Sequence, residues 1–112
     1  MRNGLYAIVI EMLDGVDARA TGVIVLRDGA LHGGDSYFYY TGNYVSGPEK
    51  WRGELVTHQH TPSRGNPVFG GRDVSVGFSG KYDADGAVVY GTALVGSRSV
   101  SFRATLRRLT DA

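Results

Sequence analysis

Two histidines two positions apart are the residues of this sequence best suited to bind a metal ion. His58 and His60 flank Gln59, so an extended strand would place both imidazoles on one face, where they could supply two ligands to zinc, iron or nickel. Glu54 falls on the same face, and His32 is the only other histidine. A metal centre needs three or four converging ligands with a supporting shell. Partly exposed strand histidines are therefore the preferred interpretation, and no metal or other cofactor is predicted.

The remaining motifs that could support catalysis or ligand binding are better explained as turns and bends. Asp83, Asp85 and Gly86 resemble the start of a calcium loop, but residues 87–89 supply no further oxygen ligand, which favours a hairpin turn. Residues 33–36 are followed by no lysine and no helix start, so they predict a bend in a strand and not a phosphate loop. No serine lies in a nucleophile elbow, and no catalytic trio can be argued from spacing. The sequence therefore indicates no enzyme.

The aromatic residues allow two interpretations. They pack together as a core, or they line a pocket for a small apolar ligand. Tyrosine and tryptophan in excess also suit a protein interface, since each has an apolar body and a polar tip. Core packing is favoured. If the protein has a ligand cavity, the residues predicted to line it are Tyr6, Tyr37, Tyr39, Trp51, Phe78 and Phe102.

These residues must be positioned by strands, because apolar and polar residues alternate along most of the chain. The clearest case is the last segment, where Val100, Phe102, Ala104 and Leu106 alternate with polar residues. Residues 4–13 have two apolar faces, which predicts a strand buried on both sides. The 61–72 segment is predicted to be the longest loop. Further strands are expected over 18–26, from residue 30 through an aromatic run to about 45, and over 50–60, 74–82 and 87–94.

The turns between these segments predict a strongly curved sheet. Asp28 and Gly29 form a two-residue hairpin loop, which needs positive φ at both positions. Gly33 and Gly34 are expected to bend the following strand, so that the sheet curls toward closure. No segment has a helical apolar stripe. We therefore expect an all-β fold, a single antiparallel barrel of about eight strands over residues 1–112, with an interior that is filled or holds one small ligand.

Size and charge limit the classes of partner. The chain has 112 residues, the size of one domain, and its 42% hydrophobic and 21% charged residues are typical of a globular protein. A net charge of +1 offers no broad field for nucleic acid or anionic lipid. Cysteine is absent, which excludes disulfides, and the apolar start is interrupted by Glu11. We expect a cytoplasmic protein that binds neither nucleic acid nor membrane.

Several short runs together resemble the GrlR family, negative regulators of type III secretion. The glycine-glycine-aspartate step after a glycine-rich hairpin is the most specific of them. The likeness is firmest over residues 3–42. The matching runs are Asn3-Gly4-Leu5-Tyr6, Gly22-Val23-Ile24-Val25-Leu26, Asp28-Gly29, Gly33-Gly34-Asp35, Tyr40-Thr41-Gly42 and His58-Gln59-His60.

The resemblance implies a lipocalin-like β-barrel that forms a homodimer, has no cofactor and sequesters a transcriptional activator through an acidic surface loop. By position, that loop falls between Tyr44 and Trp51. Only Glu49 is acidic there and Lys50 follows it, so the charge that would attract a basic activator is missing. The protein is expected to regulate by protein–protein binding, and the alternative is a lipocalin-like carrier of a small apolar ligand. The partner-binding residues implied are Ser46, Gly47, Pro48, Glu49 and Lys50.

Overall fold

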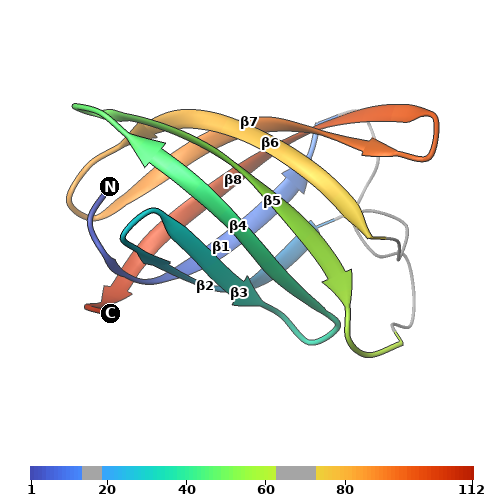
Figure 1. Ribbon diagram of the computed structural model, residues 1–112, viewed down its shortest axis with the longest axis horizontal. Coiled ribbons are helices and arrows are strands. Elements are labelled where there is room, and N and C mark those ends of the chain that lie inside the picture. Colours follow the sequence, from blue (N-terminus) through green and yellow to red (C-terminus); the bar gives the residue numbers. More distant parts are fainter. Residues whose placement is uncertain (14–18, 63–72) are drawn as a thin grey trace.

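The computed structural model describes residues 1–13, 19–62 and 73–112, and these residues form eight strands and the turns between them (Figure 1). The turn expected at 14–17 and most of the loop expected over 61–72 lie outside the described residues. No helix with the length and hydropathy needed to cross a membrane is found in the described part of the chain. The strands are β1 (Gly4–Met12), β2 (Arg19–Arg27), β3 (Ala30–Gly34), β4 (Phe38–Ser46), β5 (Lys50–Gln59), β6 (Val74–Tyr82), β7 (Gly86–Val95) and β8 (Arg98–Thr110).

The sheet closes on itself. Each strand pairs antiparallel with the next, and β8 returns to pair with β1, where Leu106 lies opposite Ile8. The predicted all-β fold, a closed antiparallel barrel of eight strands, is confirmed. Closure gives every strand a partner on both sides, so no strand is a full-length free edge, although the short β3 pairs only with residues 23–27 of β2.

Alternation along the strands places one face of each strand inside the barrel. In β8 the side chains of Val100, Phe102, Ala104 and Leu106 are buried, as the sequence predicted. The prediction that β1 is buried on both faces is wrong. Its inward residues are buried, but Leu5, Ala7 and Val9 remain partly exposed because no described second layer covers the outside of the barrel.

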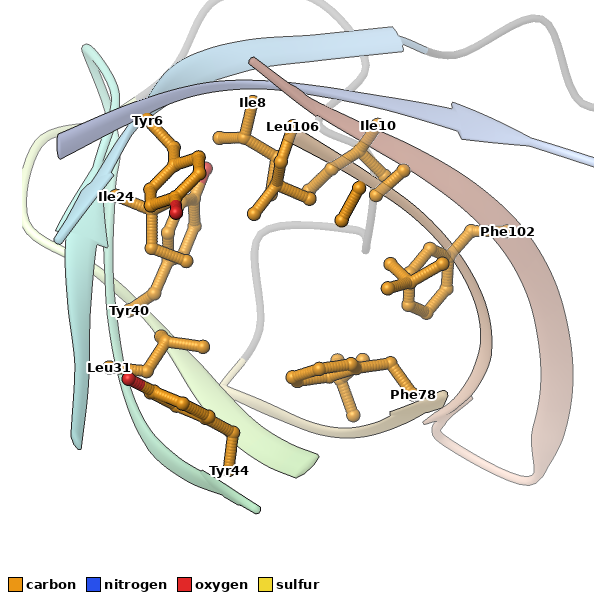
Figure 2. Close-up of a cluster of buried hydrophobic side chains, with 14 of the residues drawn as sticks. Tyr6, Ile8, Ile10, Ile24, Leu31, Tyr40, Tyr44, Phe78, Phe102 and Leu106 are labelled. Atoms are coloured by element: carbon orange, nitrogen blue, oxygen red, sulfur yellow. The ribbon is translucent and has the colours of Figure 1, made fainter. Parts of the chain in front are cut away.

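Glycines make room for the rings inside the barrel. Register places Gly53 between Tyr44 and Phe78, and Gly91 between Phe78 and Phe102, so rings and glycines alternate across five strands. A Cβ at Gly53 would come within 2.8 Å of the Phe78 ring, and one at Gly91 within 2.5 Å of the Phe102 ring. Figure 2 shows Phe78 and Phe102 facing Tyr6 and Tyr40 across the interior.

Of the turn and the bend predicted near the start of the chain, one is found where it was predicted and the other is displaced. Asp28 and Gly29 have φ of 51° and 85°, which confirms the two-residue hairpin turn. The bend predicted at the double glycine is displaced. Gly33 and Gly34 lie within β3, where a Cβ at Gly33 would be 2.4 Å from a carbonyl oxygen of β2, and the chain reverses after them, from Asp35.

Candidate functional site

The outer face of β4–β7 has two adjoining shallow depressions, which we together call the outer groove. One has a volume of about 670 Å³ and the other about 460 Å³. Both are too open to enclose a small molecule, so they suit a segment of another macromolecule better. They share Val45, Arg52 and Ser79. Side chains of the first include Asn43, Val45, Arg52, Glu54, Ser79, Tyr90 and Thr92, and those of the second Val45, Lys50, Arg52, Ser79 and Lys81.

A glycine, which has no side chain, forms the floor of the first depression. Gly77 lies at an outward position of β6, and a Cβ added there would have no atom within 4 Å. Glu54 and Thr92 lie opposite it on β5 and β7. The next outward row ends in two large side chains, Val45, which is 61% exposed, and Tyr90, which is 55% exposed. Large apolar side chains left in water beside a bare floor are typical of a contact surface.

The second depression is lined by cations, and we call it the basic depression. Lys50 and Lys81 lie directly opposite each other on β5 and β6, and Arg52 is the next outward residue of β5. None of the three forms an ion pair with another described residue. The carboxylates nearest in sequence, Glu49 and Glu54, are absent from its lining. The local charge is therefore positive in a protein whose net charge is only +1.

The five residues implied as partner-binding by the GrlR resemblance, Ser46 to Lys50, form the turn between β4 and β5 together with the strand residue at each end of it, and every one is exposed. Gly47 and Lys50 also line the basic depression. Two hydrogen bonds from other parts of the chain hold the turn in place. The Tyr82 hydroxyl donates to the Gly47 carbonyl at 2.6 Å, and the N-terminal amine donates to Ser46 Oγ at 2.7 Å. Such anchoring lowers the entropy lost on binding.

The barrel interior is nearly filled. Its cavity has a volume of about 30 Å³, enough for a water or two, whereas pockets for drug-sized ligands hold roughly 300–1,000 Å³. Of the residues predicted to line a cavity, Trp51, Phe78 and Phe102 do so and Tyr6 is buried in the core. Tyr37 and Tyr39 were predicted wrongly. They are 37% and 45% exposed, because alternation turns their neighbours Phe38 and Tyr40 inward.

Two buried polar atoms at this cavity have no hydrogen-bond partner. Trp51 and Thr57 both line it, and neither Nε1 of Trp51 nor Oγ1 of Thr57 is satisfied within the described residues. Their side chains lie on β5, and the two residues are only 3% and 2% exposed. Unpaired buried polar atoms are rare in folded proteins, so these two mark the interior as a second candidate site, although its cavity of about 30 Å³ has room only for a water or two.

The histidines do not form a metal site in the described part of the chain. His58 stacks on Tyr39 with ring centroids 4.8 Å apart, and its Nδ1 lies 3.3 Å from a carboxylate oxygen of Asp73. His60 contacts Thr61 Oγ1 at 2.7 Å and the Asp35 carbonyl at 3.0 Å. No three potential ligands converge among the residues that are described.

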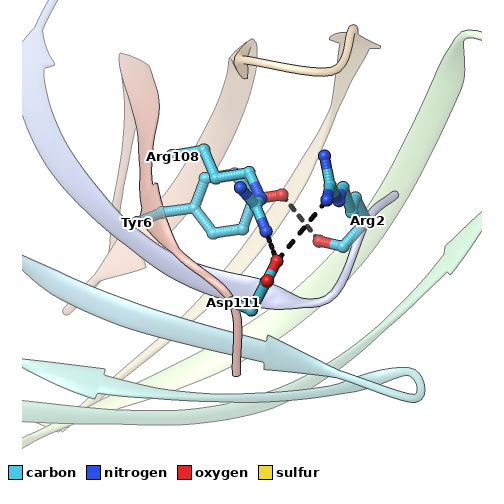
Figure 3. Close-up of polar contacts among 4 residues, drawn as sticks. All are labelled: Arg2, Tyr6, Arg108 and Asp111. Carbon is cyan, nitrogen blue, oxygen red and sulfur yellow. Dashed lines mark hydrogen bonds and ion pairs between the residues drawn. The ribbon is translucent and has the colours of Figure 1, made fainter.

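One end of the barrel carries a cluster of charged residues around Tyr6 (Figure 3). The Tyr6 hydroxyl donates to the Arg2 carbonyl at 2.6 Å. Asp111 forms ion pairs with Arg108 and with Arg2, the latter at 3.5 Å. Burial raises the pKa of Tyr6, and the charge of Arg108 opposes that shift. Residues near both ends of the sequence therefore contact one another around Tyr6 at this end of the barrel.

Sequence reasoning missed most of the outer groove. It selected the turn from Ser46 to Lys50 but not Gly77, Lys81 or Tyr90. Alternation alone places all three outward, since Val76, Phe78 and Val89 are inward. What the sequence lacks is the register between strands, which brings them beside the turn.

A scan against protein-family models and a search of curated proteins found no match to this chain. Membership of the GrlR family therefore stays a prediction from the short runs of similar sequence.

Proposed function

We propose that this protein is a non-enzymatic regulator that acts by binding another protein through the outer groove. The observation that carries the proposal is the contrast between a filled interior and a shallow outer surface with exposed apolar side chains and a bare glycine floor. The resemblance to the GrlR family supports a transcriptional regulator as the partner, and negative regulation of a type III secretion activator as the process. The proposal assumes a cytoplasmic protein.

A steric block of the groove tests this function. Gly77→Leu fills the floor at a position where a Cβ meets no atom within 4 Å, so the fold should tolerate it. Ser75→Leu is the matched control, an exposed outward position on the same strand outside the groove. In affinity capture from a lysate of the native host at low salt, wild type and Ser75→Leu should retain the same protein and Gly77→Leu should lose it. Equal retention by all three proteins, or by none, contradicts the proposal.

We also propose that the protein is a homodimer, packed through the outer face of β1 and β2. Five apolar side chains without a charged residue among them form a strip there, with Leu5 opposite Val25 and Ala7 opposite Val23. Val23 is 46% exposed. A symmetric contact would cover this strip on both copies at once. The strip consists of Leu5, Ala7, Val9, Val23 and Val25.

The unpaired atoms inside the barrel favour a second candidate function, the carrying of a small apolar ligand. Trp51 Nε1 is a donor without an acceptor, so the ligand would carry a carbonyl or ether oxygen. Because the cavity of about 30 Å³ holds only a water or two, the side chains around it would have to move apart to admit such a molecule. Trp51 is the only tryptophan, so its fluorescence reports directly on occupancy. A saturable change in its emission with short-chain ketones, absent with alkanes of equal length, is expected. No change with either class removes this function.

A further inference from the structure

We infer that the segment bound by the outer groove is acidic, and that its carboxylates dock in the basic depression while an adjacent apolar side chain packs on Val45. This inference rests on the proposed function and specifies the chemistry of the partner. Three cations line the depression, Lys50, Arg52 and Lys81, and no carboxylate is among its lining residues.

The register makes the positive charge costly to the isolated protein. Lys50 and Lys81 lie directly opposite each other, and like charges at such positions repel across the ladder. Neither lysine has an ion-pair partner in the described residues, and neither does Arg52. A carboxylate placed between the two ammonium groups would relieve this repulsion, so binding an acidic group is favoured by complementary charge.

The apolar part of the surface specifies the rest of the segment. Val45 is 61% exposed and lines both depressions, so a ligand carboxylate at the lysines would place its neighbouring residues over Val45. Tyr90, at the far side of the groove, is 55% exposed. Burial of such side chains by an aliphatic or aromatic residue would add binding energy that does not depend on salt.

The small area of the basic depression disfavours a nucleic acid as its ligand. A polyphosphate chain needs a stripe of cations along its backbone. Here the basic depression is short, and Glu54 lines the neighbouring depression, where it would repel the next phosphate. A short acidic peptide matches a patch of this size better than a phosphodiester chain does.

Nuclear magnetic resonance titration of the isotope-labelled protein tests the inference. The probes are a synthetic peptide of alternating glutamate and leucine, the same peptide with glutamine for glutamate, and an oligothymidylate. We expect the acidic peptide alone to shift the amide signals of Val45, Lys50 and Lys81, and the shifts to diminish with salt. Equal shifts with the glutamine peptide, tighter binding of the oligothymidylate, or no shift with any probe would overturn it.

Charge reversal adds a matched pair of variants. Lys50→Glu combined with Lys81→Glu keeps one like-charge pair across the ladder, so stability should stay close to wild type while affinity for the acidic peptide falls roughly tenfold or more. Arg98→Glu is the control, because the β7–β8 turn lies at the opposite end of the barrel from the β4–β5 turn (Figure 1). Unchanged affinity in the double variant, or an equal loss in the control, contradicts the inference.

Affinity capture with the groove variants distinguishes failure of this inference from failure of the proposed function. If the double lysine variant still retains the protein partner in affinity capture while Gly77→Leu loses it, protein binding through the groove stands and the acidic segment does not. If neither variant affects capture, the groove itself is not the binding surface.

Discussion

Asp35 holds the turn between β3 and β4 with a single carboxylate. One oxygen accepts hydrogen bonds from the backbone amides of Tyr37 and Phe38, both at 2.8 Å, and the other accepts the Tyr40 hydroxyl at 2.5 Å. The carbonyl of Asp35 also contacts His60 beyond the end of β5. This residue was part of the motif read as a bend in a strand, and the structure gives it the role of turn anchor.

Replacement of Asp35 should destabilise the fold, because three hydrogen bonds end on its carboxylate. We expect Asp35→Ala to lower the free energy of unfolding by about 3 kcal/mol, because it leaves two amides and a buried hydroxyl without their charged acceptor. Urea unfolding followed by Trp51 fluorescence measures the change. Ser36→Ala, at the exposed next residue, is the control and should stay within about 0.5 kcal/mol of wild type. Equal stability of the two variants would contradict the role of Asp35.

Tyr40 makes stability depend on alkaline pH. Burial is the larger cause and the hydrogen bond to Asp35 the next, and both raise the pKa of Tyr40 above its ordinary value of 10.0. Because the folded state holds the phenol proton to a higher pH than the unfolded state does, the unfolded state releases that proton first as the pH rises above 10, and this favours unfolding. The stability present below pH 10 is therefore lost as the pH rises above it.

We expect the free energy of unfolding of wild type to fall more steeply above pH 10 than that of Tyr40→Phe, which has no proton to lose at this position. Urea unfolding at a series of pH values measures both slopes. Tyr39→Phe, at a ring 45% exposed on the outer face, is the control and should follow wild type. Parallel curves for wild type and Tyr40→Phe would show that the Tyr40 phenol does not contribute.

At the scale of strands, two glycines on the neighbouring strands β6 and β7 have opposite roles, because one faces the interior and the other faces solvent. Gly91 faces inward from β7, where a Cβ would lie 2.3 Å from the Gly77 carbonyl oxygen and 2.5 Å from the Phe102 ring. Gly77 faces outward from β6 into open space. We expect Gly91→Ala to destabilise the protein by about 2 kcal/mol through overpacking, and Gly77→Ala to be neutral or slightly stabilising. Thermal unfolding by circular dichroism compares them, and the reverse order would contradict the glycine–ring alternation.

The sequence was sufficient to predict the strands and their closure, because alternation and turn residues are local signals. Asp28 and Gly29 specified their own turn, and Asp83 forms the expected one by accepting the amides of Asp85 and Gly86 at 2.8 and 3.0 Å. The groove could not be predicted in the same way. Whether Lys50 meets Lys81 depends on the register of two strands that are well separated in the sequence, and a shift of two residues keeps both outward but separates them.

At the scale of the whole molecule, closure restricts how the protein can associate. A barrel without a free edge cannot extend its sheet into a partner, so contacts must form between faces or turns. The described surface offers two candidate faces, the groove on β4–β7 and the apolar strip on β1 and β2. In the closed barrel, β3 separates the strip from the groove on one side and β8 separates them on the other, so the two faces lie on different parts of the barrel wall. A homodimer packed through the strip would leave both grooves open for the partner.

Light scattering of the purified protein at micromolar concentration tests this arrangement. We expect the mass of a dimer for wild type and of a monomer for Val23→Glu, because a carboxylate in the middle of the strip would have to be buried without a partner. Val88→Glu is the control, since Val88 is similarly exposed, at 41% compared with 46% for Val23, but lies on β7. Circular dichroism and Trp51 emission must match wild type in both variants, so that loss of mass reports association and not unfolding. A monomeric wild type, or equal dissociation in the two variants, would exclude a dimer packed through β1 and β2 and leave the groove as the face through which the barrel associates.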